Sequence, residues 1–359
     1  MRRRDLVAAG VVSAIDWSIS PPRAWPQSDD VLELGVVSDA VRLRLSRLME
    51  EYSVPGASLV LFRRGTTMQN SLGRRDRSRP RAPVDQDTVF EAASMSKPVF
   101  AYAVMKLCER GELNLDTPLT RYTPKRFLDG DARLDVITAR HALSHTTGFQ
   151  NWRSDDEPLS IHFAPGERFE YSGEGYSYLQ SVLTEITGMP IEEYMQANLF
   201  VPFGMTSSGY VWRELFERNA AMPHDREGFP MVKKKPTPAD AARYASAGDL
   251  HTTAMDYARF VIEVIDPKPR DQFRLGTESL SEMLRPQVAV GDEYGTEWAL
   301  GWRIPRRGII AHGGDNVGFH CWAVASVVSK SGFVIMTNGE RGGEMLLPLL
   351  ADENLNRLL

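Results

Sequence analysis

Ser94-Met95-Ser96-Lys97 is the stretch that decides the fold and the chemistry expected of this chain. A serine is followed three positions later by a lysine, at the head of an apolar run with helical periodicity. Residues three apart share a helix face, so the Lys97 amine can reach the Ser94 hydroxyl. A serine hydroxyl is a weak nucleophile near neutral pH, and a lysine with a lowered pKa can accept its proton. The alternative is a helix-capping serine followed by a surface lysine.

The surroundings of this stretch predict a strand that leads into a helix. Thr88-Val89-Phe90 is typical of a short β segment, and Ser94 is expected to open the helix that follows. Pro98 fits a first helical turn, where its missing N–H costs nothing, and Gly111 fits the residue just past the helix end. A serine at a helix N-terminus lies near unpaired backbone N–H groups and the positive end of the dipole.

A second candidate is Tyr171, in the aromatic and glycine-rich segment over residues 165–176. A Pro-Gly turn leads into an extended stretch, which ends in a Gly-rich loop before a helical run. A tyrosine on such a loop can act as a general base or proton relay if cations hold it as phenolate or share its proton. The alternative is a half-buried aromatic side chain that anchors a turn.

A third candidate is His312-Gly313-Gly314-Asp315, read as the end of one β segment and the approach to the next. The two glycines allow a ligand to lie against the strand backbone. A backbone N–H here can form half of an oxyanion hole, and His312 can bind a substrate carboxylate or carbonyl. A Gly-rich hairpin with an incidental histidine would give the same pattern.

In this order, the three elements resemble the serine β-lactamase and penicillin-recognising enzyme superfamily. The resemblance is to the branch with class C β-lactamases, D-alanyl-D-alanine carboxypeptidases, D-aminopeptidases and family VIII carboxylesterases. It extends over about residues 54–338, because further stretches are similar to landmarks of the branch. These stretches are residues 54–60, 110–119, 143–149 (Leu-Ser-His-Thr-Thr-Gly-Phe), 203–205 and 247–253.

The resemblance implies a role for each candidate. Ser94 matches the acyl-accepting nucleophile, Lys97 its partner base, and Tyr171 the tyrosine of a Tyr-x-Asn motif. His312-Gly313-Gly314 matches a Lys-Thr-Gly motif, and the backbone N–H groups of Ser94 and Asp315 would form the oxyanion hole.

One position departs from the family pattern, because Gly173 stands where the Tyr-x-Asn motif has its asparagine. In the family that amide orients the lysine and touches an acylamino group of the substrate. Its absence weakens the expectation of strong β-lactam or peptide recognition and leaves the acyl-transfer machinery intact.

The composition excludes several other classes of protein. With 359 residues, 42% of them hydrophobic, the chain can bury a large core in one or two domains. A net charge of −5 and a pI near 5.9 argue against a nucleic-acid partner. Cys108 and Cys321 are expected as buried free thiols, and no metal motif, cofactor motif or membrane-spanning run is present. The expected partner is a small ester or amide substrate, and the oligomeric state stays open.

The first 30 residues form a separate segment. Met1-Arg2-Arg3-Arg4 precedes a short apolar stretch, and Val12-Ser13-Ala14 fits a cleavage site, which resembles a twin-arginine export signal. Asp16 interrupts the stretch, so a disordered basic tail on a cytoplasmic protein is equally consistent. Residues up to about 30 are read as linker, and both a periplasmic or secreted location and a cytoplasmic one stay open.

Strand signals gather at the two ends of the chain, and the middle is rich in helices and loops. The expected strands cover residues 57–62, 67–71, 298–302, 319–324 and 333–336, with a final helix over about 343–359. This predicts an α/β (α+β) fold in which one antiparallel sheet, flanked by helices, is built from both termini. Residues 31–118 and 240–359 would form this discontinuous domain and residues 119–239 a mostly helical insert, with the site in the cleft between them.

Three functions are consistent with these residues. The first is a carboxylic-ester hydrolase that forms an acyl-enzyme on Ser94 with small acyl esters. The second is an amide hydrolase of the β-lactamase, D-Ala-D-Ala carboxypeptidase or D-aminopeptidase kind. The third is a non-catalytic relative that keeps the pocket without turnover. Ser94, Lys97 and Tyr171 together argue against the third, and Gly173 and His312 favour the first over the second.

Overall fold

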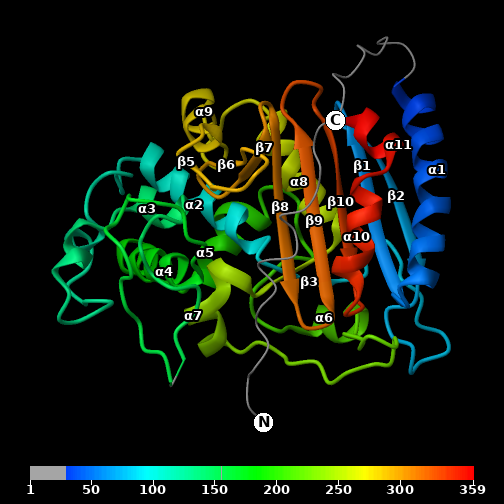
Figure 1. Ribbon diagram of the computed structural model, residues 1–359, viewed down its shortest axis with the longest axis horizontal. Coiled ribbons are helices and arrows are strands. Elements are labelled where there is room, and N and C mark those ends of the chain that lie inside the picture. The colour runs from blue at the N-terminus through cyan, green and yellow to red at the C-terminus, as the bar shows by residue number, and fades with distance from the viewer. Residues whose placement is uncertain (1–29, 155) are drawn as a thin grey trace.

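The computed structural model describes residues 30–154 and 156–359. The expected export signal and most of the linker therefore lie outside the described residues. The frame of the molecule is an eight-stranded antiparallel sheet in the order β2-β1-β10-β9-β8-β7-β6-β5 (Figure 1). Its strands are β1 Gly56–Arg63, β2 Thr66–Gly73, β5 Val288–Ala289, β6 Glu297–Trp298, β7 Arg303–Arg306, β8 Ile309–Asn316, β9 Phe319–Ser326 and β10 Ser331–Thr337.

Strand β1 shows how the sequence builds this sheet from both ends of the chain. It pairs with β2 on one side and with β10, near the C-terminus, on the other. All its residues are buried, because both faces of the sheet are covered by helices. Leu59 and Leu61 belong to one core, and Val60 and Phe62 to the other, as the two-residue period of a strand requires.

The two faces of the sheet are covered by different helices. Helices α1 Asp30–Glu51, α10 Gly342–Leu350 and α11 Glu353–Leu358 lie on the face of Leu59 and Leu61. Helices α2 Ser96–Glu109 and α8 Ala254–Ile265 belong to the core on the opposite face. Figure 1 shows α1, α10 and α11 on one side of the sheet and the helix-rich part of the chain on the other.

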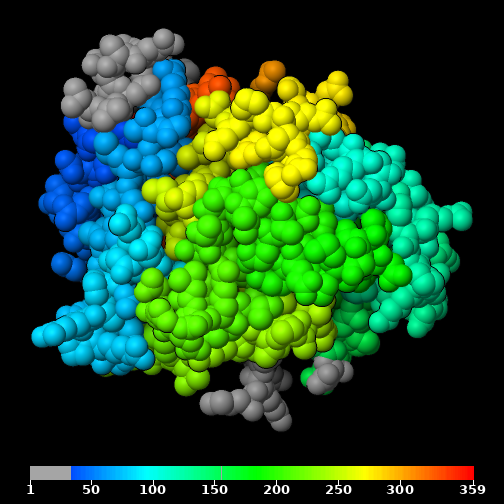
Figure 2. All heavy atoms as spheres, turned by 180° about the vertical axis from the view of Figure 1, so that it is seen from behind, coloured from blue at the N-terminus to red at the C-terminus, as the bar shows by residue number. Residues whose placement is uncertain are grey.

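The middle of the chain is mainly helices and loops, and Figure 2 shows it in green as a continuous surface beside the blue N-terminal elements. A small second sheet, β3 with β4, adjoins it. The division of the chain at residues 119 and 239 stays a prediction. The remaining elements are β3 Phe90–Ala93, β4 Leu250–Thr252, α3 Ala139–Leu143, α4 Gly173–Thr187, α5 Ile191–Met195, α6 Glu214–Asn219, α7 Pro238–Gly248, α9 Thr277–Leu284, the 3₁₀ turns Leu119–Arg121 and Ala132–Val136, and the π turn Gln196–Phe200.

The structure corrects several expected boundaries. The strand that leads into the nucleophile is β3, Phe90–Ala93, and α2 begins at Ser96. Ser94 therefore lies in the turn between β3 and α2 and does not open the helix. The expected strand over 298–302 ends at Trp298, because Gly301, with φ +86°, turns the chain into β7. The final helix is broken in two, since Asp352 caps a new helix with its side chain.

Candidate active site

The turn between β3 and α2 holds Ser94 and Lys97 together, as their spacing predicts. The Nζ atom of Lys97 lies 3.2 Å from the Oγ atom of Ser94 and donates to the carbonyl oxygen of Ala247 at 2.7 Å. The turn itself is pinned from two sides. Tyr257 donates its hydroxyl to the Met95 carbonyl at 2.9 Å, and the hydroxyl of Ser96 donates to the Ala93 carbonyl at 2.6 Å.

Lys97 is buried, with 1% of its surface exposed. Burial lowers the pKa of Lys97 to about 7, because a charged ammonium is poorly solvated there. Near neutral pH a large fraction of the amine is therefore unprotonated. Its lone pair is then available to take a proton from the adjacent serine hydroxyl.

Tyr171 completes this cluster from the segment just before α4. The Nζ atom of Lys97 lies 4.7 Å from the centroid of the Tyr171 ring, and the Tyr171 hydroxyl interacts with the Ser94 side chain. Burial raises the pKa of Tyr171 above its usual value, and the nearby Asp315 carboxylate raises it further. The phenol therefore keeps its proton at neutral pH. Of the two roles expected from the sequence, this favours the proton relay over the phenolate base.

His145 lies behind Tyr171 and was not singled out as a site residue from the sequence. Its ring stacks on Tyr171 with 4.1 Å between centroids, and its Nδ1 atom accepts the backbone N–H of Ser172 at 3.0 Å. Burial lowers the pKa of His145 well below its usual value, so the ring is neutral. The Leu-Ser-His-Thr-Thr-Gly-Phe stretch was the available signal, and it carried no indication of which ring the histidine supports.

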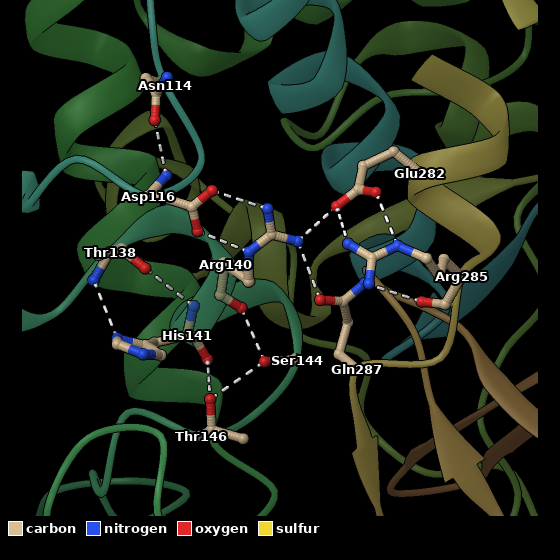
Figure 3. Close-up of polar contacts among 10 residues, drawn as sticks. All are labelled: Asn114, Asp116, Thr138, Arg140, His141, Ser144, Thr146, Glu282, Arg285 and Gln287. Carbon is tan, nitrogen blue, oxygen red and sulfur yellow. Dashed lines mark hydrogen bonds and ion pairs between the residues drawn. The ribbon is translucent and has the colours of Figure 1, made fainter. Parts of the chain in front are cut away.

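The loop with His145 is anchored by Arg140 on α3 (Figure 3). The Arg140 guanidinium makes a two-pronged contact with Asp116, at 2.6 and 2.8 Å, and donates to Gln287 at 2.9 Å. The backbone carbonyl of Arg140 accepts a hydrogen bond from the Ser144 hydroxyl at 2.7 Å. A paired planar guanidinium has a fixed geometry, so this network holds the loop against the segment before β5.

Residues His312 to Asp315 lie within β8 rather than between two strands, which corrects the sequence interpretation. The described contacts of β7 with β8 reach only as far as Ala311, so the next residues of β8 form an edge toward Ser94. A Cβ on Gly314 would lie 2.1 Å from the Ala92 carbonyl oxygen, and one on Gly313 2.0 Å from the Trp322 ring. Both glycines are therefore required by close packing against the nucleophile turn and β9.

His312 is buried and neutral. Burial and, to a lesser extent, the nearby Lys97 lower the pKa of His312 to about 3. Its Nδ1–H donates to the Gly313 carbonyl at 2.7 Å, so the other ring nitrogen carries a lone pair. An acceptor of this kind offers neither a positive charge nor a donor to a substrate carboxylate, which argues against that part of the expected role.

Two carboxylates flank the same edge. Asp315 accepts a hydrogen bond from Nδ1 of His320 at 2.6 Å, and its side chain stays 28% exposed. Asp292 binds the Arg303 guanidinium at 3.1 Å, with both side chains largely buried. The guanidinium charge is thus matched by a carboxylate, whereas Asp315 adds a negative charge beside a histidine.

Ser94, Tyr171, His312 and Asp315 border one cavity of about 240 Å³. Among the residues with a described structure, no cluster of acidic, histidine or cysteine side chains fits a metal ion, and no helix has the length and apolarity to cross a membrane. Five of the cavity's lining residues are aromatic, and they share the wall with the candidate nucleophile and several polar side chains. Its main lining residues are Ser94, Asn151, Trp152, Phe169, Tyr171, Arg303, His312, Asp315, Asn316, Trp298 and Trp322.

Known proteins share sequence and fold with this chain. The family model described as Beta-lactamase matches residues 41–352. The chain belongs to the β-lactamase family. This is a family of serine hydrolases, and both esterase and penicillin-binding relatives occur in it. The chain is 32% identical to esterase EstB of Burkholderia gladioli over 56% of this chain and 58% of that protein. It is 28% identical to penicillin-binding protein 4 of Amycolatopsis lactamdurans over 82% of this chain and 84% of that protein.

Solved structures share the fold at low identity. A class C β-lactamase superimposes with a TM-score of 0.75 at 18% identity, covering 92% of this chain and 99% of that one. A β-lactamase/D-alanine carboxypeptidase from Pseudomonas syringae gives 0.73 at 20% identity, covering 88% and 99%. The antiparallel sheet flanked by helices is thus confirmed as a β-lactamase-like fold.

Proposed function

We propose that this chain is a carboxylic-ester hydrolase that forms an acyl intermediate on Ser94. The observation that supports it best is the charge of the pocket. His312 is neutral, the Arg303 charge is matched by Asp292, and Asp315 adds a carboxylate. Penicillins, cephalosporins and peptides that end in D-alanine all carry a carboxylate. A substrate carboxylate placed beside Asp315 meets a like charge, whereas a neutral ester meets no such cost.

The first half of the reaction uses the cluster around Ser94. Neutral Lys97, 3.2 Å from the hydroxyl, takes the proton as the Ser94 oxygen attacks the ester carbonyl. The backbone N–H groups of Ser94 and Asp315 hold the oxyanion that develops. The Tyr171 phenol gives its proton to the departing alkoxide and is reprotonated from Lys97, which leaves an acyl-Ser94 ester.

The second half of the reaction, deacylation, regenerates the free enzyme. A water gives a proton to Lys97 as it attacks the acyl carbonyl, and the Ser94 oxygen leaves and regains its proton. Ester hydrolysis requires few further groups from the enzyme, because the alkoxide leaving group departs readily. An amide requires a firmly oriented substrate and full protonation of its nitrogen. The absence of a motif amide at Gly173 therefore costs amide hydrolysis more than ester hydrolysis.

A second function is favoured by one specific feature, the Asp315 carboxylate. A substrate with an ammonium group would be attracted to it, as in an amide hydrolase of the D-aminopeptidase kind. The non-catalytic alternative is disfavoured, because a buried lysine held beside a serine hydroxyl is costly without a reaction to perform.

A kinetic panel on the purified protein tests this proposal. It compares p-nitrophenyl butyrate, nitrocefin, benzylpenicillin and D-alanine p-nitroanilide by kcat/KM. We expect the neutral ester to be the best substrate by a wide margin. Efficient hydrolysis of benzylpenicillin would overturn the proposal, and preference for D-alanine p-nitroanilide would establish the second function in its place.

A further inference from the structure

The position where the Tyr-x-Asn motif loses its asparagine is filled by another side chain. A Cβ built on Gly173 would lie 2.4, 2.5 and 2.8 Å from three atoms of the Trp152 indole. These distances are far shorter than any real contact, so the indole lies directly on the Gly173 backbone. The missing amide has therefore been replaced by an aromatic surface that also lines the cavity beside Ser94.

We propose that Trp152 is a specificity-determining residue, which selects esters with a flat apolar group and rejects those with a polar acylamino group. The inference rests on the proposed ester hydrolysis at Ser94 and names the substrate class of that site. A flat apolar group can stack on the indole, whereas an amide placed on the ring face would lose its water and gain no hydrogen-bond partner from the ring.

Trp152 is held rigidly, because both of its neighbours are bound to the first turn of α4. The carbonyl of Asn151 accepts the N–H groups of Gly173 and Glu174, each at 3.1 Å, and the Asn151 side-chain oxygen accepts the Gly173 N–H at 2.8 Å. The Arg153 guanidinium donates to Glu174 at 2.6 Å, and the Arg153 N–H donates to the other carboxylate oxygen at 3.0 Å.

The contact between Arg153 and Glu174 is buried on the Glu174 side. Glu174 is 1% exposed, so its carboxylate depends on Arg153 for its charge partner. The indole also meets Tyr244 edge-on, with 5.6 Å between centroids. The contacts of the residues before and after Trp152, and the contact with Tyr244, thus hold the indole in place. A rigid wall discriminates between substrate shapes better than a mobile one.

Other aromatic rings border the same cavity. Phe169 and Trp298 lie 5.2 Å apart, tilted by 39°, and both line the cavity with Trp152. Aromatic rings in such arrangements favour flat apolar partners. A substrate group that enters here meets ring surfaces on several sides. The two side-chain amides that line the cavity are already engaged, since the Asn151 oxygen accepts the Gly173 N–H and the Asn316 amide donates to Glu91 and to the Gly248 carbonyl.

The test compares two p-nitrophenyl esters of equal length, 4-phenylbutyrate and hippurate. They differ in that hippurate carries an amide where 4-phenylbutyrate has two methylenes. For the native protein we expect kcat/KM to favour 4-phenylbutyrate by roughly tenfold or more. Trp152→Ala should bring the ratio toward one, and Trp152→Phe should keep most of it. A ratio that is the same in the native protein and in Trp152→Ala would overturn the inference.

A second pair of substrates identifies the half of the ester that meets the indole. Benzyl acetate and ethyl acetate differ in the alcohol alone. If Trp152→Ala loses the 4-phenylbutyrate preference and keeps the benzyl preference, the result supports an indole on the acyl side alone; if it loses both, the result supports contact with both halves. An unchanged 4-phenylbutyrate preference contradicts the inference whatever the benzyl ratio.

A binding measurement separates this inference from the proposed function. Calorimetry with the amides 4-phenylbutyramide and hippuramide gives the same comparison without turnover. If the native protein cleaves no ester but binds 4-phenylbutyramide better, and Trp152→Ala loses that preference, the proposed function fails and the inference stands. Equal binding of the two amides by the native protein would refute it. Thermal melting checks that each variant is folded.

Discussion

The two sides of the cavity differ in how closely they follow the family pattern. On one side Ser94, Lys97 and Tyr171 are the residue types that the family motifs have at these positions. On the other side, β8 and the Trp152 loop depart from it, with a neutral histidine, a glycine, a carboxylate and an indole in place of cationic and amide groups. The reacting groups and the recognising groups are therefore separable, and each can be altered without the other.

The reacting side should be the more sensitive of the two. Ser94→Ala, Lys97→Ala and Tyr171→Phe should each lower kcat by roughly 10³-fold or more. Because the three groups act on one proton and one oxygen, the double variants should lose little beyond the worse single variant. Steady-state kinetics with p-nitrophenyl butyrate measures this.

A matched control exists for the tyrosine. The hydroxyl of Tyr178, on α4, is buried without a partner among the described residues, and Tyr178 does not line the cavity. Tyr178→Phe should keep near-native kcat. Comparable losses in Tyr171→Phe and Tyr178→Phe would show that the effect is one of packing.

The pH profile reports on the same side. Since burial lowers the pKa of Lys97 to about 7, its base form is lost as the pH falls through that value. We expect kcat/KM to rise about tenfold per pH unit up to about 7 and then level off. A profile that is flat between pH 5 and 8 would mean that Lys97 is not the base.

On the recognition side of the cavity, the larger effect should come from a change of side-chain volume at Gly173. Gly173→Asn alone should not restore the motif, because its side chain would occupy the space of the Trp152 indole. Overpacking of this kind costs about 1–3 kcal/mol, so we expect a lower melting temperature and lower activity. Trp152→Ala combined with Gly173→Asn should recover the stability. Calorimetric melting of Gly173→Asn, Trp152→Ala and the double variant measures this. A Gly173→Asn variant as stable as the native protein would show that the loop with Trp152 moves aside easily.

Charge should have the smallest effect. Asp315→Asn keeps the backbone N–H and the side-chain shape but removes the carboxylate. The test uses matched p-nitrophenyl esters of 4-trimethylammoniobutyrate and 5,5-dimethylhexanoate, which differ only in charge. The preference for the cationic ester should fall by about threefold to tenfold. An unchanged ratio would remove Asp315 from substrate recognition.

The sequence anticipated what depends on local pattern. The Ser94–Lys97 pairing follows from helical spacing, and the strand expected over residues 57–62 is found as part of β1. The stacking of His145 on Tyr171 was missed, because it joins residues 26 positions apart in two loops. The indole over Gly173 was missed for the same reason, since a glycine in a sequence does not show what packs on it.

Intact-mass spectrometry tests the central claim most directly. The native protein is incubated with a p-nitrophenyl alkylphosphonate, which transfers its phosphonyl group to a reactive serine and releases p-nitrophenol. The account predicts a single stoichiometric adduct on the native chain and none on the folded Ser94→Ala variant. An adduct that persists on Ser94→Ala would place the nucleophile elsewhere and contradict the account.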